Sequence, residues 1–338
     1  MKPTLRDIAE RANVSPATVS NALNGRGGVS KTVQENILAL AQEMGYQVGK
    51  ETARTGRHVR LIVYKTHGKV IKYNQFFSEI MESIQLECYR SGLELLISHV
   101  SAQDRTDSAD QVSWFRNEEC AGMILLGTEM RAEELAPFMG ARSPLVVLDN
   151  LFRLENVHAV AMDNWQAGYL AGKALMDAGL RDIHHITSTI PFNNMEERRR
   201  GLRDALEDQG LTLGEDRIWS VRTAMEEAYE DMRALLAKRG KPPEAFFAGN
   251  DSMAIGCMRA LVEAGYRVPE DVSIIGMDDT SICLACTPQL STIHVDTQEL
   301  GRTTVRMLTS LSEEEGAALC PLKVTVGVRL VMRGTVRV

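Results

Sequence analysis

Residues 4–25 read TLRDIAERANVSPATVSNALNG, and this stretch decides the fold of the N-terminal part of the chain. Apolar residues recur at helical spacing from Leu5 to Ala12 and predict a first helix. Ser15 followed by Pro16 is typical of a helix start, because serine caps free backbone N–H groups and proline at the first helical position has none to leave unpaired. Two short helices separated by a turn of about three residues match a helix-turn-helix.

The second helix is expected from Pro16 to about Leu23, and residues 30–44 predict a third. The face of the second helix that its apolar residues leave free carries small or polar side chains: Ala17, Thr18, Ser20 and Asn21. Such a face suits a helix lying in the major groove of DNA, because bulk blocks approach while hydroxyls and amides contact phosphates and base edges. The alternative is a small helical bundle with no DNA partner.

Charge is distributed unevenly along the 338 residues. The net charge of the whole chain is −7, yet residues 1–60 carry nine Lys/Arg against five Asp/Glu, a net charge of +4. The remaining residues therefore sum to −11. A basic module joined to an acidic body is the pattern expected of a DNA-binding head on a domain that does not bind DNA.

Compartment signals favour a cytoplasmic protein. The N-terminal residues contain no apolar run that would serve as a signal peptide, and no eighteen consecutive residues are apolar, so no membrane span is expected. The six cysteines are irregularly spaced, which predicts a reducing compartment and no disulfide framework.

From residue 60 onward, strand-like apolar runs alternate with amphipathic helices, the pattern of a parallel α/β sheet. The expected strands are 61–64, 93–97, 123–126, 145–148, 184–186, 245–248 and 272–275. The expected helices are 77–90, 165–178, 196–209, 226–238, 253–264 and 298–311. Two such sets imply two lobes, and the cleft between them is the expected ligand site.

The run from Thr4 to Gly25 closely resembles the head of the lactose/galactose repressor (LacI/GalR) family. The match continues through Val29-Ser30, residues 44–46 and several segments of the body: 76–80, 163–164, 198–201, 249–254, 268–279 and 287–293. The resemblance therefore covers nearly the whole chain. It implies a transcription regulator, usually a repressor, with an N-terminal all-α helix-turn-helix head and an α/β two-lobed sensor domain like a periplasmic sugar-binding protein.

The predicted domains follow from this resemblance. We expect a helix-turn-helix DNA-binding domain at 1–46, a linker or hinge at 47–60, and an effector-binding and dimerisation domain at 61–338. Its first lobe is expected to comprise about 61–160 with 294–318, and its second lobe about 161–290 with 322–338.

The resemblance also implies which residues of the head contact DNA. Pro16, Ala17 and Asn21 fall at base-reading positions, and Thr18, Ser20 and Asn24 fall where relatives contact phosphates. The predicted DNA-binding set also includes Thr4, Ser15 and Ser30. Many relatives carry arginine at the position of Asn21; because asparagine favours adenine and arginine favours guanine, the operator half-site is expected to have adenine there.

The linker departs from the family pattern. It is about two residues shorter than usual, and Arg54 runs directly into Thr55-Gly56-Arg57 without the leucine that relatives insert into the minor groove. A hinge helix and a flexible tether therefore remain alternatives. Lys50, Arg54 and Arg57 are the predicted contacts with the DNA backbone.

Carried over position by position, the effector-binding residues are Phe77, Asp149, Arg198, Asn250 and Asp278. Carboxylate, amide and guanidinium groups around an aromatic ring suit a polyhydroxylated ligand, so a sugar or sugar derivative is expected. The alternatives are a helix cap for Asp278, a solvated charge run for Arg198 and core packing for Phe77. Val295 stands where several sugar-responsive relatives have a polar side chain, so a purine-like effector is the second possibility.

Other signals argue against catalysis and metal binding. Cys283-Leu284-Ala285-Cys286 has no second pair to complete a zinc site, and no nucleophile motif or carboxylate pair indicates an enzyme. No cofactor or metal is expected. The second functional hypothesis is a solute-binding protein with the same body fold, against which the basic head argues. A symmetric homodimer reading a pseudo-palindromic operator is expected, because one small head binds weakly.

Overall fold

The structure is a computed structural model that describes residues 5–12, 14–15, 18–19, 22, 31–44, 58–71, 75–103, 105–313 and 320–337. Its internal contacts divide the chain into two compact units, Met1–His58 and Val59–Val338. Each unit is described by itself.

The first unit is a small helical core. Helices α1 (Leu5–Ala12) and α3 (Lys31–Glu43) pack together, and helical residues at 18–19 and 22 lie between them in sequence. The buried side chains are the apolar residues of the helical pattern: Ile8, Ala9, Val19, Ala22, Ile37 and Ala41. Gln34 Nε2 donates a 3.1 Å hydrogen bond to the carbonyl of Ala22 and ties α3 to the middle segment.

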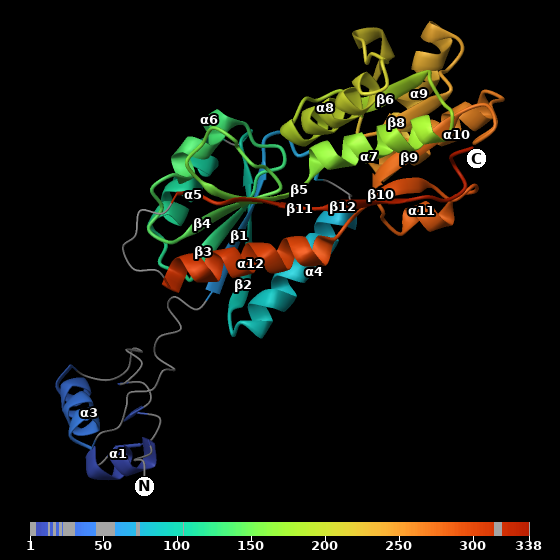
Figure 1. The fold of residues 1–338 in the computed structure, drawn as a ribbon. Coiled ribbons are helices and arrows are strands. Elements are labelled where there is room, and N and C mark those ends of the chain that lie inside the picture. Colours follow the sequence, from blue (N-terminus) through green and yellow to red (C-terminus); the bar gives the residue numbers. More distant parts are fainter. Residues whose placement is uncertain are drawn as a thin grey trace. The chain divides into compact units, whose positions relative to one another are not determined.

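The second unit contains two six-stranded sheets (Figure 1). The first sheet has the order β11-β5-β4-β3-β1-β2, and the second has the order β12-β10-β9-β8-β6-β7. The strands of the first sheet are β1 (His58–Lys65), β2 (Glu94–Ser101), β3 (Gly122–Leu126), β4 (Leu145–Leu148), β5 (His158–Met162) and β11 (Lys323–Val326). Those of the second sheet are β6 (Ile183–Ser188), β7 (Ile218–Val221), β8 (Ala245–Ala248), β9 (Ser273–Asp278), β10 (Ser291–Val295) and β12 (Val328–Val331).

Helices cover both faces of each sheet, as the alternation of strands and helices predicts. The first sheet is covered by α4 (Gln75–Arg90) and α12 (Thr297–Glu313), and by α5 (Arg105–Asn117), α6 (Ala132–Leu135) and the 3-10 turn η1 (Ala136–Phe138). The second is covered by α7 (Asn164–Asp177) and α8 (Asn193–Glu207), and by α9 (Met225–Arg239) and α10 (Asp251–Glu263). Two short elements, η2 (Glu215–Arg217) and α11 (Ile282–Ala285), complete the second lobe. The predicted fold class is confirmed.

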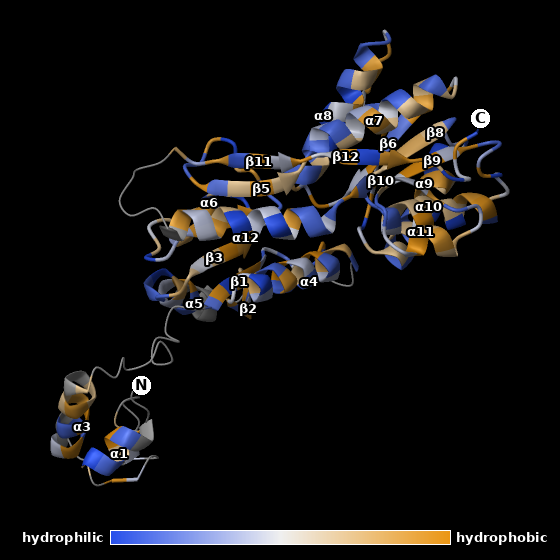
Figure 2. Cartoon of the chain, turned by 60° about the horizontal axis from the view of Figure 1, so that its bottom comes forward, coloured by the Kyte–Doolittle hydropathy of each residue, from blue (hydrophilic) through white to orange (hydrophobic). Residues whose placement is uncertain are grey.

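Burial alternates along the strands because successive side chains face opposite layers. Phe247 of β8 packs toward α7 and α8, whereas its neighbour Phe246 packs in the cluster that contains α9 and α10. Figure 2 shows β8 and β9 as largely hydrophobic and α8 and α12 as bearing hydrophilic bands. Strands buried on both faces read as continuous apolar runs, which is why the sequence predicts β3, β4, β8 and β9; the buried strands β5 and β10 were not predicted.

Two strands belong to a different lobe from the one that was expected for their residues. β11 pairs in parallel with β5 and completes the first sheet, although residues 322–338 were expected in the second lobe. β10 pairs with β9 and β12 in the second sheet, although 294–318 were expected in the first. The chain thus returns to the first lobe for α12 and β11 and crosses back after Gly327, a step that no apolar run reveals.

A histidine buried in the second lobe gives stability a pH dependence. The backbone carbonyl of Phe247 accepts a 2.9 Å hydrogen bond from Nδ1 of His185, so in the neutral ring Nε2 carries no proton, and it has no partner among the described residues. Burial lowers the pKa of His185 from 6.5 to about 4. As the pH falls, His185 is therefore protonated near pH 6.5 in the unfolded chain but only near pH 4 in the folded chain. Between these values protonation stabilises the unfolded chain relative to the folded one.

We expect His185 to cost the wild type about 3 kcal/mol of unfolding free energy as the pH falls from 7 to 4. His185→Asn keeps an N–H donor near the position of Nδ1 and does not titrate. Subtracting the pH profile of the variant from that of the wild type in urea unfolding isolates this loss, because groups common to both proteins cancel. Parallel profiles would contradict the assignment.

Candidate functional site

Two predicted carboxylates lie at carboxyl ends of strands, one in each lobe. Asp149 follows β4 with φ 64°, and Asp278 ends β9 with φ 111°, followed by Asp279 with φ 61°. The left-handed region is unfavourable for residues other than glycine, and it persists where surrounding contacts hold it. Such positions gather at functional sites. Among the described residues four that are not glycine have a positive φ, namely Asp149, Phe152, Asp278 and Asp279, and the first and third are residues that the resemblance assigns to the effector.

Amide contacts hold the loop after β4. Asn150 Nδ2 donates 3.1 Å hydrogen bonds to the carbonyls of Gly127 and Met130, and its Oδ1 accepts from the backbone N–H of Phe152. Asn150 is itself buried. The backbone at Asp149 is thereby fixed by its neighbour, and the Asp149 side chain is left for other contacts.

A buried carboxylate holds the loop after β9. Asp251, at the start of α10, accepts hydrogen bonds from Thr280 N at 2.8 Å and Thr280 Oγ1 at 3.0 Å. Arg333 Nη2 donates to Asp279 at 2.5 Å. These contacts secure the two residues that follow Asp278, which is 7% exposed and whose side chain accepts no hydrogen bond from the part of the chain that the structure describes. Its two oxygens are therefore available to a ligand.

Arg198, on α8, is buried with 4% of its surface exposed, so it does not belong to a solvated charge run. Its Nε donates to Asn164 Oδ1 at 2.9 Å, Nη1 donates to the carbonyl of Gly249, and Nη2 lies 3.4 Å from the sulfur of Met162. The guanidinium thus joins the end of β5 in the first lobe to the loop after β8 in the second.

Asp149 also joins the lobes. Its Oδ2 accepts a 2.6 Å hydrogen bond from Thr128 of its own lobe, and its Oδ1 accepts a 3.0 Å hydrogen bond from Asn194 on α8. Close by, Arg153 of the first lobe donates to Glu197 of α8 at 2.8 Å. The predicted ligand residues therefore lie where the two lobes meet.

Electrostatics show that the charged members are close together. Burial raises the pKa of Asp149 to about 6, against the opposing hydrogen bonds and the positive charge of Arg198. Burial also raises the pKa of Asp278 well above its ordinary value, with Arg198 opposing and Asp251 and Asp149 adding to the increase. Burial lowers the pKa of Arg198, which the three carboxylates counteract. A single guanidinium therefore stabilises several buried acids.

The other two predicted effector residues have structural contacts. Asn250 Oδ1 caps α10 by accepting a 2.7 Å hydrogen bond from Met253 N. Phe77 packs in the core, with its ring 5.3 Å from that of Phe76 at an interplanar angle of 75°. Val295 is buried in the same core. The structure groups Asp149, Arg198 and Asp278, whereas Phe77 and Val295 have core positions.

Sequence reasoning missed several polar residues that build this site. Thr128, Asn194 and Asp251 hold the predicted carboxylates or their loops, and Glu129 holds the loop after β1. The consecutive asparagines 193–194 at the start of a helix were a usable signal. Their partners lie tens of residues away in sequence, so single-sequence patterns do not reveal the pairing.

In the head, the structure describes two of the predicted DNA contacts. Ser15 Oγ accepts a 3.0 Å hydrogen bond from Thr18 N, as a helix N-cap does, and lies 2.8 Å from Thr18 Oγ1. The other predicted DNA contacts lie outside the described residues: Thr4, Pro16, Ala17, Ser20, Asn21, Asn24, Ser30, Lys50, Arg54 and Arg57.

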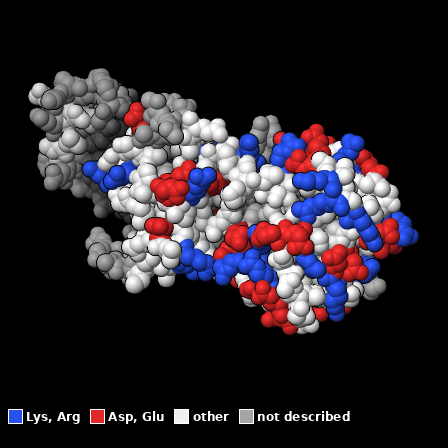
Figure 3. Space-filling view, turned by 90° about the horizontal axis from the view of Figure 1, so that it is seen from above, with Lys and Arg blue, Asp and Glu red and all other residues white. Residues whose placement is uncertain are grey.

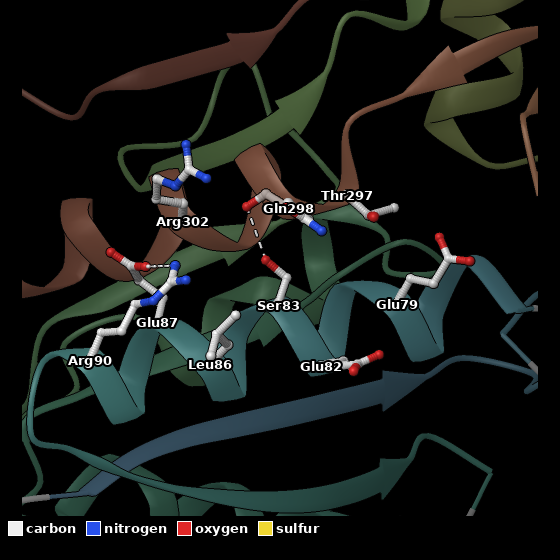
Figure 4. A pocket seen from close by; sticks show the side chains of 9 residues that line it. All are labelled: Glu79, Glu82, Ser83, Leu86, Glu87, Arg90, Thr297, Gln298 and Arg302. Atoms are coloured by element: carbon white, nitrogen blue, oxygen red, sulfur yellow. Dashed lines mark hydrogen bonds and ion pairs between the residues drawn. The ribbon is translucent and has the colours of Figure 1, made fainter.

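A second surface feature is a groove of about 210 Å³ between α4 and α12 (Figure 4). Ser83 Oγ donates to the carbonyl of Gln298 at 2.9 Å across it, and Arg90 pairs with Glu87 at 3.4 Å. Leu86 lines the groove and is exposed. The groove mixes acidic and basic side chains, and Figure 3 shows both signs interspersed on the face of the second unit seen from above.

The structure also bears on the two cysteines of the Cys283–Cys286 motif and on membrane-spanning segments. Cys283 is buried in the core of the second lobe, and Cys286 Sγ donates to the carbonyl of Cys283 at 3.3 Å. Among the described residues, no helix combines the length and apolar composition needed to cross a membrane.

Comparison with known proteins agrees with this architecture. Residues 4–48 match the model of bacterial regulatory proteins of the lacI family, and residues 173–336 match that of a periplasmic binding protein-like domain. The ribose operon repressor of Haemophilus influenzae is 30% identical over 310 residues, covering 90% of each chain. The HTH-type transcriptional repressor PurR of the same species is 29% identical over 308 residues, again 90% of each.

The fold has close counterparts among solved structures. The lac repressor dimer bound to operator and the anti-inducer ONPF superposes with a TM-score of 0.74 at 23% sequence identity, covering 100% of both chains. That likeness shows the fold. Together with the head match and the nearly full-length similarity to a named repressor, it confirms the family resemblance seen in the sequence. The chain belongs to the lacI family of bacterial regulatory proteins and is a DNA-binding transcription regulator with an effector-binding domain.

Proposed function

We propose that the chain is an operator-binding repressor whose affinity for DNA is set by a sugar or sugar derivative bound between its two lobes. The observation that carries the proposal is the buried cluster of Arg198, Asp149 and Asp278, which draws on strand ends of both lobes. A ligand that engages groups from both lobes changes how they meet, and differential affinity for two lobe arrangements is what couples the effector to the heads.

The sugar assignment rests on hydrogen-bonding chemistry. The carboxyl group of Asp278 offers two oxygens for hydrogen bonding, and Asn250 Nδ2 offers donors, a set that vicinal hydroxyl groups, which both donate and accept, satisfy. The name of the ribose operon repressor points to a carbohydrate-linked system in a relative. In this proposal the chain catalyses no reaction, needs no cofactor or metal, and acts in the cytoplasm, where the operator is.

Retention of labelled duplex DNA tests the regulatory assignment. The intact chain is expected to retain DNA with an affinity that falls steeply as salt rises, and deletion of residues 1–46 is expected to abolish retention. A solute-binding protein would show no difference between the two chains. A thermal-shift panel tests the effector class: stabilisation by nucleobases and by no carbohydrate would contradict the sugar.

Operator preference gives a sharper test of the head. Replacing Asn21 with arginine is expected to shift half-site selection from adenine to guanine, because arginine pairs with guanine O6 and N7. A bidentate contact discriminates by about 1–3 kcal/mol. Selection from a random duplex pool measures the shift, with Lys50→Ala as a control that weakens binding without changing the base. Unchanged selection would refute the role of Asn21.

We further propose a homodimer built on α4 and the edge strand β2. This face exposes apolar side chains to solvent: Leu86 and Tyr89 on α4, and Ile97 on β2. Tyr89 is 80% exposed, and an edge strand leaves backbone groups free to pair. The interspersed charges of the neighbouring groove suit a two-fold contact, in which each copy meets the same surface.

Charge placed on this face is expected to separate the dimer. Ile97→Lys should weaken self-association at least about tenfold, since burying an unpaired charge costs well over 1.4 kcal/mol. Sedimentation velocity over a range of concentrations measures the change. Leu154→Lys is the matched control, because Leu154 is 98% exposed and lies away from α4 and β2. Equal dimerisation of both variants would place the interface elsewhere.

A further inference from the structure

A single carboxylate holds residues 67–71 of the loop that follows β1. Glu129, in the segment after β3, is 3% exposed. Its Oε2 accepts hydrogen bonds from the backbone N–H groups of His67 at 3.0 Å and Gly68 at 2.7 Å. Its Oε1 accepts from those of Val70 at 2.8 Å and Ile71 at 3.3 Å. One side chain thus supplies the acceptors that a strand or helix would otherwise supply.

The loop held by Glu129 reaches the second lobe. The carbonyl of Lys69 accepts a 2.9 Å hydrogen bond from Thr223 Oγ1, in the loop between β7 and α9. Val70 and Ile71 anchor the loop to the first lobe by packing in its apolar core. The position of the Lys69 carbonyl is therefore fixed by the packing of its neighbours in the core and by the hydrogen bonds that Glu129 accepts from the same loop.

Glu129 also adjoins the effector cluster in sequence. Thr128 donates to Asp149 at 2.6 Å, and the carbonyl of Met130 accepts from Asn150. Residues 128–130 consequently connect two surfaces of the first lobe that meet the second: the loop after β1, which contacts Thr223, and the loop after β4, which contacts Asn194.

We propose that Glu129 is a positioning residue of the effector site: it fixes the loop at residues 67–71 so that its backbone forms the first-lobe half of the closure contact with Thr223. This deepens the proposed function, because it assigns lobe closure over the effector to a residue that need not touch the effector. A buried carboxylate has the same role in the second lobe, where Asp251 accepts a hydrogen bond from the backbone N–H of Thr280 in the loop after Asp278.

Glu129→Gln tests the proposal because it changes one oxygen into an NH₂ group. Two backbone N–H donors then face a donor instead of an acceptor, while size and shape are kept. Glu133→Gln is the matched control, since Glu133 is exposed on the neighbouring helix α6. Both variants are made in the full-length chain.

The first readout is hydrogen exchange at the amides of residues 67, 68, 70 and 71. We expect exchange in this segment to rise at least about tenfold in Glu129→Gln and to stay at the wild-type rate in Glu133→Gln and in β1 of both. Thr223→Val, which removes the contact with Lys69 but not the carboxylate, should leave these amides protected.

The second readout measures the contact between the two lobes at Lys69 and Thr223. Cysteines introduced as Lys69→Cys and Met225→Cys keep the Lys69 carbonyl and the Thr223 hydroxyl, and Met225 is exposed at the start of α9. With the exposed Cys320 replaced by serine, they report the contact through the rate of cross-linking by a short bismaleimide. We expect Glu129→Gln to slow this reaction about tenfold relative to Glu133→Gln, with thermal unfolding midpoints used to confirm that both fold. Neither readout needs an identified effector or DNA.

Faster exchange with an unchanged cross-linking rate would overturn the proposal, because Glu129 would then hold the loop without setting closure. Unchanged exchange would also overturn it. Failure of the proposed function is recognised separately, by the absence of salt-sensitive DNA retention in the intact wild-type chain, and leaves the exchange and cross-linking results standing.

Discussion

Replacing Arg198 with methionine is expected to lower the unfolding free energy by about 3–5 kcal/mol, the usual cost of removing one partner from a buried charged network. The variant leaves Asn164 Oδ1 and the carbonyl of Gly249 without their donor. It also removes the positive charge that opposes the raised pKa of Asp278, which is then expected to stay protonated to higher pH. Urea unfolding measures the loss.

Arg200→Met is the matched control for this prediction. Arg200 lies two residues along the same helix, is half-exposed, and pairs with Glu197 at 2.8 Å. Exposed ion pairs contribute about 0–1 kcal/mol, so this variant should be nearly as stable as the wild type. We also expect Arg198→Met to lose effector-dependent changes in DNA retention and Arg200→Met to keep them. Equal stability of the two variants would contradict the buried role of Arg198.

Gly168→Ala is the second variant with a large expected effect. Helices α7 and α8 cross so closely that a Cβ at Gly168 would lie 1.9 Å from the carbonyl oxygen of Arg198 and 2.7 Å from the backbone nitrogen of Leu202. Backbone atoms cannot move aside as a side chain does, so the helices must separate. We expect a loss of about 3 kcal/mol, the upper part of the range for overpacking, and a displaced Arg198.

The neighbouring glycine of α7 provides the comparison. A Cβ at Gly172 would meet the side chain of Leu202 at 2.9 Å, which can adjust, and the methyl of Ala205 at 3.0 Å. Alanine is also a better helix former than glycine by about 1 kcal/mol. Gly172→Ala should therefore change stability by less than about 1 kcal/mol. Thermal unfolding of both variants decides, and similar midpoints would show that the crossing is looser than the structure indicates.

The sequence carries most of the fold because the pattern of burial is local. Doubly buried strands such as β8 and β9 appear as continuous apolar runs, and the helices between them keep a helical period. Five strands were not predicted: β5, β7, β10, β11 and β12. β11 escaped prediction because its burial is only partial and its partner β5 lies some 160 residues away. A short strand that completes a sheet edge has little signal of its own.

The site was predictable to the extent that it matches family positions. Composition alone placed Arg198 in a charged run, and only the resemblance indicated the buried role that the structure gives it. Two features depend on contacts between separate elements: the left-handed conformation at Asp149 and Asp278, and the hydrogen bonds that Glu129 accepts from four backbone N–H groups. Residue type and spacing carry no trace of those contacts.

Selection of bound duplexes from a random pool by the full-length chain, with and without a panel of sugars and nucleobases, tests the central claim most directly. We predict enrichment of a pseudo-palindromic site with two related half-sites, and a change in that enrichment when one sugar is present. If no duplex is preferred over random competitor at low salt with any compound, the assignment of an effector-controlled DNA-binding regulator is contradicted.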